Sequence, residues 1–226
     1  MIGIIGAMDM EVADITAAMT ETEKAEKGML TFYKGKLSGK DAVVVKCGAG
    51  KVNAAICAQR LISDFGVDLI INTGVAGGLD KQLGVCDTVV ADKVCQHDMD
   101  TTALGEPAGL ISGLNMIYME CDKKLVDILV KTAPEGKAFV GTVATGDAFI
   151  CDEKRAAGIA ETFGACACEM EGGAIGHVCC CATIPCAVLR TISDNGENSA
   201  QMSFEQFASI AAKRASEHII RAVELM

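Results

Sequence analysis

Short apolar runs rich in β-branched residues alternate with helical patterns along almost the whole of this 226-residue chain. Such alternation is typical of an α/β fold in which helices flank a mainly parallel sheet. The expected strands cover residues 2–5, 30–37, 41–47, 68–73, 86–94, 138–146, 165–169 and 185–192. The expected helices cover residues 9–20, 51–65, 122–132, 152–163, 171–182 and 203–224.

The chain is long enough for one large domain over residues 1–226, and no repeat or linker divides it. Residues 29–47 predict an antiparallel excursion with its turn at Ser38-Gly39-Lys40-Asp41. Residues 101–116 are rich in Gly, Thr and Pro and predict a long loop. Loops of that length in compact domains often serve as lids or binding loops.

The last expected helix, residues 203–224, has the clearest pattern. Its apolar residues recur at helical spacing, and Phe204 falls on the resulting stripe. Ser203 and Gln206 fit a capping box, which predicts that the helix begins at about residue 203.

The charge balance limits the classes of partner. A formal net charge of −10 argues against nucleic acid or an anionic membrane surface, because both attract basic patches. No apolar run approaches the roughly 20 residues that a membrane-spanning helix needs. The start of the chain, Met1 to Gly6, lacks a basic segment and predicts a strand, so we expect a cytoplasmic protein.

The chain has 12 cysteines, which outside a secretory context predict reduced thiols and no disulfide framework. Their spacing does not favour a metal site, because no Cys-x-x-Cys pair occurs and Cys179-Cys180-Cys181 cannot all face one ion from a helix. We expect most of them to be small buried hydrophobes, and we expect no metal or cofactor.

Residues 168–174 place two carboxylates, Glu169 and Glu171, inside an apolar stretch. Buried acids are costly unless they are hydrogen-bonded. Backbone amides near a helix start could satisfy both, or a ligand with hydroxyl groups could satisfy one. On a strand the two side chains would share a face, whereas they would diverge if a helix begins near Met170.

In open α/β sheets, ligands bind outside the carboxyl ends of the strands. The segments after the expected strands share glycines, acids and one aromatic residue, so we expect them to meet on one rim. These segments are Gly6-Ala7-Met8-Asp9-Met10-Glu11, Gly48-Ala49-Gly50-Lys51, Gly74-Val75-Ala76-Gly77-Gly78, Gly146-Asp147-Ala148-Phe149-Ile150, Glu169-Met170-Glu171 and Ser193-Asp194.

Each segment alone is a weak signal. The Gly48–Lys51 segment resembles the end of a P-loop, but Val52 stands where Ser or Thr belongs. The Gly74–Gly78 cluster lacks the Gly-x-Gly-x-x-Gly spacing of a dinucleotide site. Phe149 fits either a core position or a stacking surface for a flat ligand.

Taken together, the segments resemble the 5′-methylthioadenosine/S-adenosylhomocysteine nucleosidases, which belong to the nucleoside phosphorylase superfamily. The resemblance rests on Gly3-Ile4-Ile5-Gly6-Ala7-Met8 with Glu11, Ile71-Asn72-Thr73-Gly74-Val75-Ala76-Gly77-Gly78, Gly146-Asp147-Ala148-Phe149-Ile150, Glu169-Met170-Glu171 and Ser193-Asp194. It implies one α/β domain around a mixed, partly barrel-like sheet, a homodimer, and hydrolysis of these nucleosides to adenine and a thioribose product.

Carried over by position, the resemblance implies that Glu11 activates the attacking water and that Asp194 protonates the purine at N7. Glu171 would hold the ribose hydroxyls, with Met170 packed against the sugar and Glu169 in a supporting role.

The purine would lie between the remaining matched positions. Phe149 would stack on adenine, the Ile150 backbone would read its edge, and Gly77 would line the purine and sugar pocket.

Breaking an N-glycosidic bond needs a proton donor at the base and an activated water at the sugar. Glu11 and Glu171 are expected to stay ionised, whereas Asp194 must carry a proton and so needs a raised pKa. Glu11 lies in the first turn of a helix, where the helix dipole favours the ionised form and weakens it as a base unless burial opposes the effect.

Three alternatives remain. A phosphorylase would need a cationic cradle, but no arginine lies near residues 6–11, and Arg190 lies inside a strand, where it is expected to pair with a carboxylate. A related hydrolase would act on futalosine-type nucleosides. A nucleoside-binding protein would use the same fold without catalysis.

One loop departs from the resembled family, whose members commonly carry an aromatic pair after the His97-Asp98-Met99-Asp100 segment. This pair covers the 5′ substituent across the dimer. Here the loop reads Ala103-Leu104-Gly105-Glu106-Pro107, so Leu104 is the candidate apolar lid and the preference for the 5′ group stays open. His97 could act as a base, but we expect a structural role.

Overall fold

The computed structural model describes residues 1–194 and 200–226, with the side chains of 200–203 left out. Within these residues the strands form one sheet. They are β1 (Ile2–Gly6), β2 (Thr20–Lys27), β3 (Leu30–Leu37), β4 (Lys40–Lys46), β5 (Leu69–Gly78), β6 (Thr88–Gln96), β7 (Tyr118–Glu120), β8 (Phe139–Thr145), β9 (Ala165–Glu169) and β10 (Cys186–Asp194).

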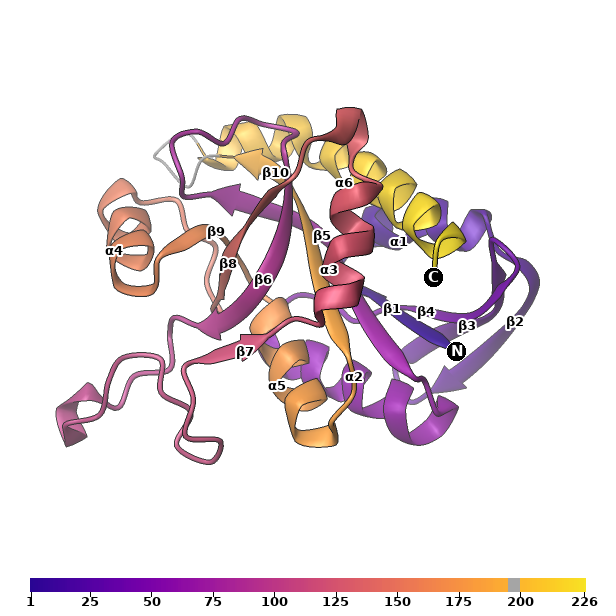
Figure 1. Cartoon of the computed structure of the whole chain (residues 1–226), viewed down its shortest axis with the longest axis horizontal. Helices are drawn as coiled ribbons and strands as arrows, with labels where there is room; N and C mark the ends of the chain where they lie inside the picture. Colours follow the sequence, from indigo (N-terminus) through magenta and orange to yellow (C-terminus); the bar gives the residue numbers. More distant parts are fainter. Residues whose placement is uncertain (195–199) are drawn as a thin grey trace.

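The sheet is mixed and partly closed (Figure 1). Its strands follow the order β10-β6-β8-β9-β5-β1-β4-β3-β2, with β7 paired to β6, and β10 also pairs with β5. Strands β5, β10, β6, β8 and β9 therefore close on one another, which confirms the partly barrel-like α/β fold expected from the sequence. Strand β1 pairs in parallel with β4 and β5, and β5 pairs in parallel with β10.

Helices cover both faces of the sheet (Figure 1). They are α1 (Asp9–Ala17), α2 (Lys51–Phe65), α3 (Lys123–Lys131), α4 (Glu153–Phe163), α5 (Gly172–Ala182) and α6 (Ala200–Glu224). Within β1, Ile4 joins the core cluster of α1, α3 and α6, whereas Ile5 joins that of α2 and α5. Burial on both faces explains why the central strands are continuously apolar. No helix in the described ranges is long and apolar enough to span a bilayer.

Two strands extend further than the sequence pattern indicated. Strand β5 continues to Gly78 and β10 to Asp194, so the Gly74–Gly78 cluster and Ser193-Asp194 lie within strands and not in loops after them. The reason is barrel closure: β5 pairs with β10 as far as Gly77 opposite Asp194, and with β9 at Gly77 and Gly78. A Cβ on Gly77 would lie 2.9 Å from Asp194 Oδ1, so glycine lets the Asp194 carboxylate approach the strand this closely.

Two strands were missed. Strand β2, Thr-Glu-Thr-Glu-Lys-Ala-Glu-Lys, is an edge strand with almost every side chain exposed, so it has no apolar alternation to detect. Charged residues on an edge strand also discourage pairing with other chains. Strand β7, which pairs antiparallel with β6, has only three residues and is too short to show a strand pattern.

The predicted hairpin is confirmed, but its turn is shorter than the expected residues 38–41, because Lys40 and Asp41 already pair within β4. Strands β3 and β4 are antiparallel, with Leu37 opposite Lys40, and the two turn residues Ser38 and Gly39 have φ angles of 47° and 78°. Positive φ at both positions is the geometry that two-residue hairpin turns favour.

The last helix starts earlier than predicted. It begins at Ala200, so Ser203 lies inside the helix and not at its cap. The Ser203 side chain of the expected capping box lies outside the described residues.

Candidate active site

A cavity of about 180 Å³ lies where the carboxyl ends of β5, β9 and β10 meet the start of α1. Its walls come from segments far apart in the chain. The lining residues are Ala7, Met8, Glu11, Ala49, Val75, Ala76, Gly77, Phe149, Cys168, Glu169, Met170, Glu171, Ser193, Asp194 and Phe204. Six of the eight residues singled out from the sequence therefore share one cavity: Glu11, Gly77, Phe149, Met170, Glu171 and Asp194.

The other two candidates do not line this cavity. Ile150 is buried in a core cluster with Ile159 and Phe163. Leu104 lies in a 3₁₀ turn, Thr102–Leu104, with 82% of its surface exposed. Its expected role as a lid depends on a partner chain and stays a prediction.

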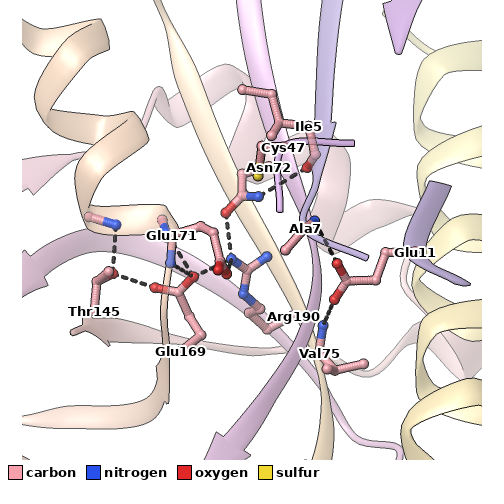
Figure 2. Close-up of polar contacts among 12 residues, drawn as sticks. Ile5, Ala7, Glu11, Cys47, Asn72, Val75, Thr145, Glu169, Glu171 and Arg190 are labelled. Carbon is pink, nitrogen blue, oxygen red and sulfur yellow. Dashed lines mark hydrogen bonds and ion pairs between the residues drawn. The ribbon is translucent and has the colours of Figure 1, made fainter. Parts of the chain in front are cut away.

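Glu11 is held by backbone amides at the start of α1 (Figure 2). Its Oε2 accepts hydrogen bonds from the N–H groups of Ala7 (2.7 Å) and Met8 (2.9 Å), and its Oε1 accepts one from Val75 (3.0 Å). Burial raises the pKa of the Glu11 carboxyl, although the charge of Arg190 and the three amides oppose this rise. The weakening of the base expected from the helix dipole is therefore outweighed by burial.

Glu169 also lines the cavity, and its carboxylate belongs to a closed hydrogen-bond network (Figure 2). Its Oε2 forms an ion pair with Arg190 and accepts hydrogen bonds from the amides of Glu171 (2.8 Å) and Gly172 (2.7 Å). Its Oε1 accepts a hydrogen bond from the Thr145 hydroxyl. Although burial opposes it, this network lowers the pKa of Glu169, with the charge of Arg190 as the main lowering cause.

Arg190 is the central cation of this network. It is 1% exposed, and besides Glu169 it donates hydrogen bonds to the Asn72 side chain and to the Leu189 carbonyl. The Asn72 amide in turn donates to the Ile5 carbonyl (3.0 Å), which anchors the group to β1. The expectation that Arg190 pairs with a nearby carboxylate is confirmed.

Glu171 has fewer partners than Glu169. Its Oε1 accepts a hydrogen bond from the Gly50 amide (2.8 Å), and its Oε2 lies 4.0 Å from Arg190 Nη2. Burial and then the negative charge of Glu169 raise the pKa of Glu171 to about 7. With a pKa near 7 both forms of Glu171 are populated at neutral pH, so the ionised state expected for it stays a prediction.

The two glutamates do not diverge as a helix start at Met170 would require. Helix α5 begins at Gly172, Glu169 is the last residue of β9, and both carboxylates approach Arg190. The amide that a P-loop would offer to phosphate is used by a protein carboxylate here, since Gly50 donates to Glu171.

Asp194 lies at the end of β10 and is 2% exposed. The Ser193 hydroxyl donates a hydrogen bond to its Oδ2 (2.9 Å), and its Oδ1 lies over Gly77. The protonated state expected for Asp194 stays a prediction.

Phe149 and Phe204 form an aromatic wall. Their ring centroids are 5.5 Å apart with an interplanar angle of 76°, and both rings line the cavity. Phe204 was missed as a site residue because its helical spacing assigned it to the apolar stripe of α6. Its position one turn after the helix start gave no signal in the sequence, because the start at Ala200 is seen only in the structure.

His97 lies away from this cavity, with its ring against the backbone of Gly146. Burial lowers its pKa. All 12 cysteines are free thiols, and most of them are buried.

The lining residues in the described part of the chain include no Lys, Arg or His. They combine acids in different surroundings with apolar and aromatic walls. Such a cavity suits an uncharged, flat ligand with hydroxyl groups, on which one acid can donate a proton and another can accept one.

Comparisons with known proteins agree with the resemblance seen in the motifs. Residues 1–224 match the family model of the phosphorylase superfamily. The aminodeoxyfutalosine nucleosidase of Campylobacter jejuni is 36% identical over 225 residues, which cover 99% of this chain and 98% of that protein. The 5′-methylthioadenosine/S-adenosylhomocysteine nucleosidase of Shewanella loihica is 39% identical over 210 residues, 91% of each chain.

A solved structure matches equally well in fold. The 5′-methylthioadenosine/S-adenosylhomocysteine nucleosidase of Neisseria meningitidis, in complex with methylthio-immucillin-A, has a TM-score of 0.96 at 31% identity, covering 100% of this chain and 99% of that one. The family prediction made from the sequence motifs is confirmed. This chain belongs to the phosphorylase superfamily, in the group that contains the 5′-methylthioadenosine/S-adenosylhomocysteine nucleosidases.

Proposed function

We propose that this protein hydrolyses the N-glycosidic bond of 5′-thio-substituted adenosines, namely 5′-methylthioadenosine and S-adenosylhomocysteine. The products are adenine and the corresponding thioribose. The observation that carries this proposal is that Glu11, Glu171 and Asp194 line one cavity in three different hydrogen-bonding environments, beside the ring of Phe149.

Cleavage places negative charge on the leaving purine and positive charge on the sugar. In this proposal Asp194 donates a proton to purine N7, and Glu11 accepts the proton of the attacking water. The raised pKa of Glu11 makes it a stronger base than an ordinary carboxylate. Ionised carboxylates near the sugar also stabilise an oxocarbenium-like transition state.

Glu171 accepts hydrogen bonds from the ribose hydroxyls in this proposal. Met170 packs against the sugar, and Phe149 stacks on the adenine, where Phe204 supports it at 5.5 Å. The Ile150 backbone at the purine edge and Gly77 in the pocket wall complete the assignment.

Water is preferred to phosphate as the nucleophile. The cavity lining contains four carboxylates and, within the described residues, no basic side chain. Arg190, the nearest buried cation, already contacts Glu169, Asn72 and the Leu189 carbonyl. An incoming phosphate would therefore meet repulsion and no cationic cradle.

A second substrate class deserves a place in the test because the Campylobacter jejuni relative, matched over nearly its whole length, is an aminodeoxyfutalosine nucleosidase. The loop that carries the exposed Leu104 has no aromatic residue to cover a 5′ group. We propose that the protein acts as a homodimer in which Leu104 of one chain forms part of the other chain's lid.

The decisive experiment measures adenine release from a panel of 5′-substituted adenosines, including aminodeoxyfutalosine, with and without phosphate. Hydrolysis predicts equal turnover in both buffers and free thioribose as product. Turnover that requires phosphate would show a phosphorylase, and nucleoside binding without adenine release would show a binding protein.

A further inference from the structure

Three segments far apart in the sequence are tied together beside the cavity by a closed ring of hydrogen bonds. The Lys51 ammonium donates to Asp98 Oδ1 (2.6 Å), the Asp147 amide donates to Asp98 Oδ2 (2.9 Å), and the Lys51 amide donates to Asp147 Oδ1 (2.8 Å). Lys51 begins α2, whereas Asp98 and Asp147 lie in the loops after β6 and β8. Each residue contacts both of the others.

This ring adjoins, along the chain, residues that belong to two walls of the cavity. The Gly50 amide, one residue before Lys51, donates to Glu171 on the sugar side. Phe149, on the purine side, lies two residues after Asp147. The start of α2 therefore holds the carboxylate of one wall through one amide and the loop of the other wall through the next amide.

The ring is built to hold this geometry. Burial alone would raise the pKa of Asp98, but the hydrogen bonds from Lys51 and from the Asp147 amide bring it below its usual value. The side chains of Lys51 and Asp98 are only 19% and 26% exposed, so solvent screens their ion pair incompletely. The Asp147 carboxylate accepts from the first amide of α2, where the helix dipole favours an anion.

The backbone at Gly50 is adapted to this contact. Gly50 has a φ of 99°, and a Cβ there would lie 3.1 Å from Asp147 Oδ1. Glycine therefore allows the carboxylate to lie over the chain while the Gly50 amide points at Glu171.

We propose that the Lys51–Asp98–Asp147 ring is a positioning device that fixes the purine wall relative to the ribose wall, and thereby sets the affinity for intact nucleosides over the separate base. This inference rests on the proposed function. None of the three residues lines the cavity, so they act through Phe149 and Glu171 and not by touching the ligand.

The test uses Lys51→Met, which keeps the α2 amide and removes the ammonium. The KM for the nucleoside should rise roughly tenfold while kcat falls by less than about threefold, because a lost charge-assisted hydrogen bond changes ligand positioning. Inhibition by free adenine, which occupies only the purine half, should change by less than about threefold. The preference for ribo- over 2′-deoxynucleoside should shrink, because Glu171 is less firmly held.

Two further variants make the test specific. Asp147→Ala should raise KM as Lys51→Met does. Asp147→Asn should keep KM near the wild-type value, because the Asn side-chain oxygen can still accept a hydrogen bond from the Lys51 amide. Lys36→Met breaks a more exposed Lys–Asp ion pair, with Asp41 on the β3–β4 hairpin, and is the control for the substitution itself, with no expected change in KM.

The outcomes separate the two proposals. If the wild type releases adenine but Lys51→Met changes KM no more than Lys36→Met does, the positioning role is wrong and the function stands. If nucleoside and adenine lose affinity equally, the ring supports only the purine wall and the coupling is wrong. If the wild type releases no adenine from any nucleoside, the proposed function fails, and the inference fails with it.

Discussion

Two glutamates only two positions apart, Glu169 and Glu171, show how differently this fold treats similar side chains. Glu169 contacts Arg190, Thr145 and two backbone amides, and its pKa is lowered. Glu171 accepts one amide hydrogen bond, stands 4.0 Å from the same arginine, and has its pKa raised to about 7. Both are buried, so burial alone does not distinguish them.

The two glutamates differ in how many of their carboxylate lone pairs already accept hydrogen bonds from the protein. A buried carboxylate whose lone pairs are all used is a structural anion, whereas one that keeps accepting capacity at a cavity wall is available to a ligand. Glu11 falls between the two, since three amides hold it and burial still raises its pKa. The following predictions test this division between the hydrogen-bonded network of Glu169 and Arg190, here called the filled network, and the other carboxylates of the cavity wall.

The largest effect is expected from Asp194→Asn in the cavity wall. The variant keeps the shape of the side chain but cannot donate a carboxyl proton, so adenine release should fall by at least about 10³-fold. Nucleoside affinity, measured by calorimetry, should stay within about threefold. Near-normal turnover would remove Asp194 from the role of acid.

Glu11→Gln should lower kcat by about 10²-fold or more with little change in affinity, because an amide cannot accept the proton of the attacking water. Single-turnover kinetics separate the chemical step from binding. An affinity loss without a loss of rate would assign Glu11 to substrate binding.

A substitution in the filled network should lower the free energy of unfolding before it affects catalysis. Glu169→Gln leaves the buried charge of Arg190 without its main partner and should lower the free energy of unfolding by about 3–5 kcal/mol in urea titrations. The matched variant Glu171→Gln should instead raise the free energy of unfolding at pH 8.

The sign for Glu171 follows from its raised pKa. The pKa of this carboxyl is about 7 in the folded protein and about 4.5 in the unfolded chain. As pH rises from about 4.5 to about 7, the unfolded chain ionises the group more easily than the folded protein does, so the free energy of unfolding falls. Removing this cost at pH 8 should stabilise the protein by about 1–3 kcal/mol, with little gain at pH 5. Equal losses of stability in Glu169→Gln and Glu171→Gln would contradict the division.

The smallest effect concerns the pH profile. If the ionised form of Glu171 binds the sugar hydroxyls, kcat/KM should rise roughly tenfold between pH 6 and pH 8, as expected for a single group with a pKa of about 7. Glu171→Gln should be slower but lack this rise. The same rise in the variant would assign it to another group.

Much of this arrangement was predictable from the chain. The motifs identified the family, and the hairpin turn at Ser38 and Gly39 followed from local composition. The charged strand β2 was not predictable, because an exposed edge strand has no buried face to impose an apolar period. Phe204 was missed for the opposite reason, since its helical spacing fitted a buried stripe.

By itself, then, the sequence determined the α/β class, the family, and six residues that meet in one cavity, because period and motif are local properties of the chain. Only the tertiary structure decided that the lone pairs of Glu169 are taken up by protein donors while Glu171 has fewer protein partners. That distinction depends on Arg190, which β10 places between Glu169 and Glu171, and on the Gly50 amide, which comes from 121 residues away. A pKa is set by burial and neighbouring charges in space, and spacing along the chain does not encode them.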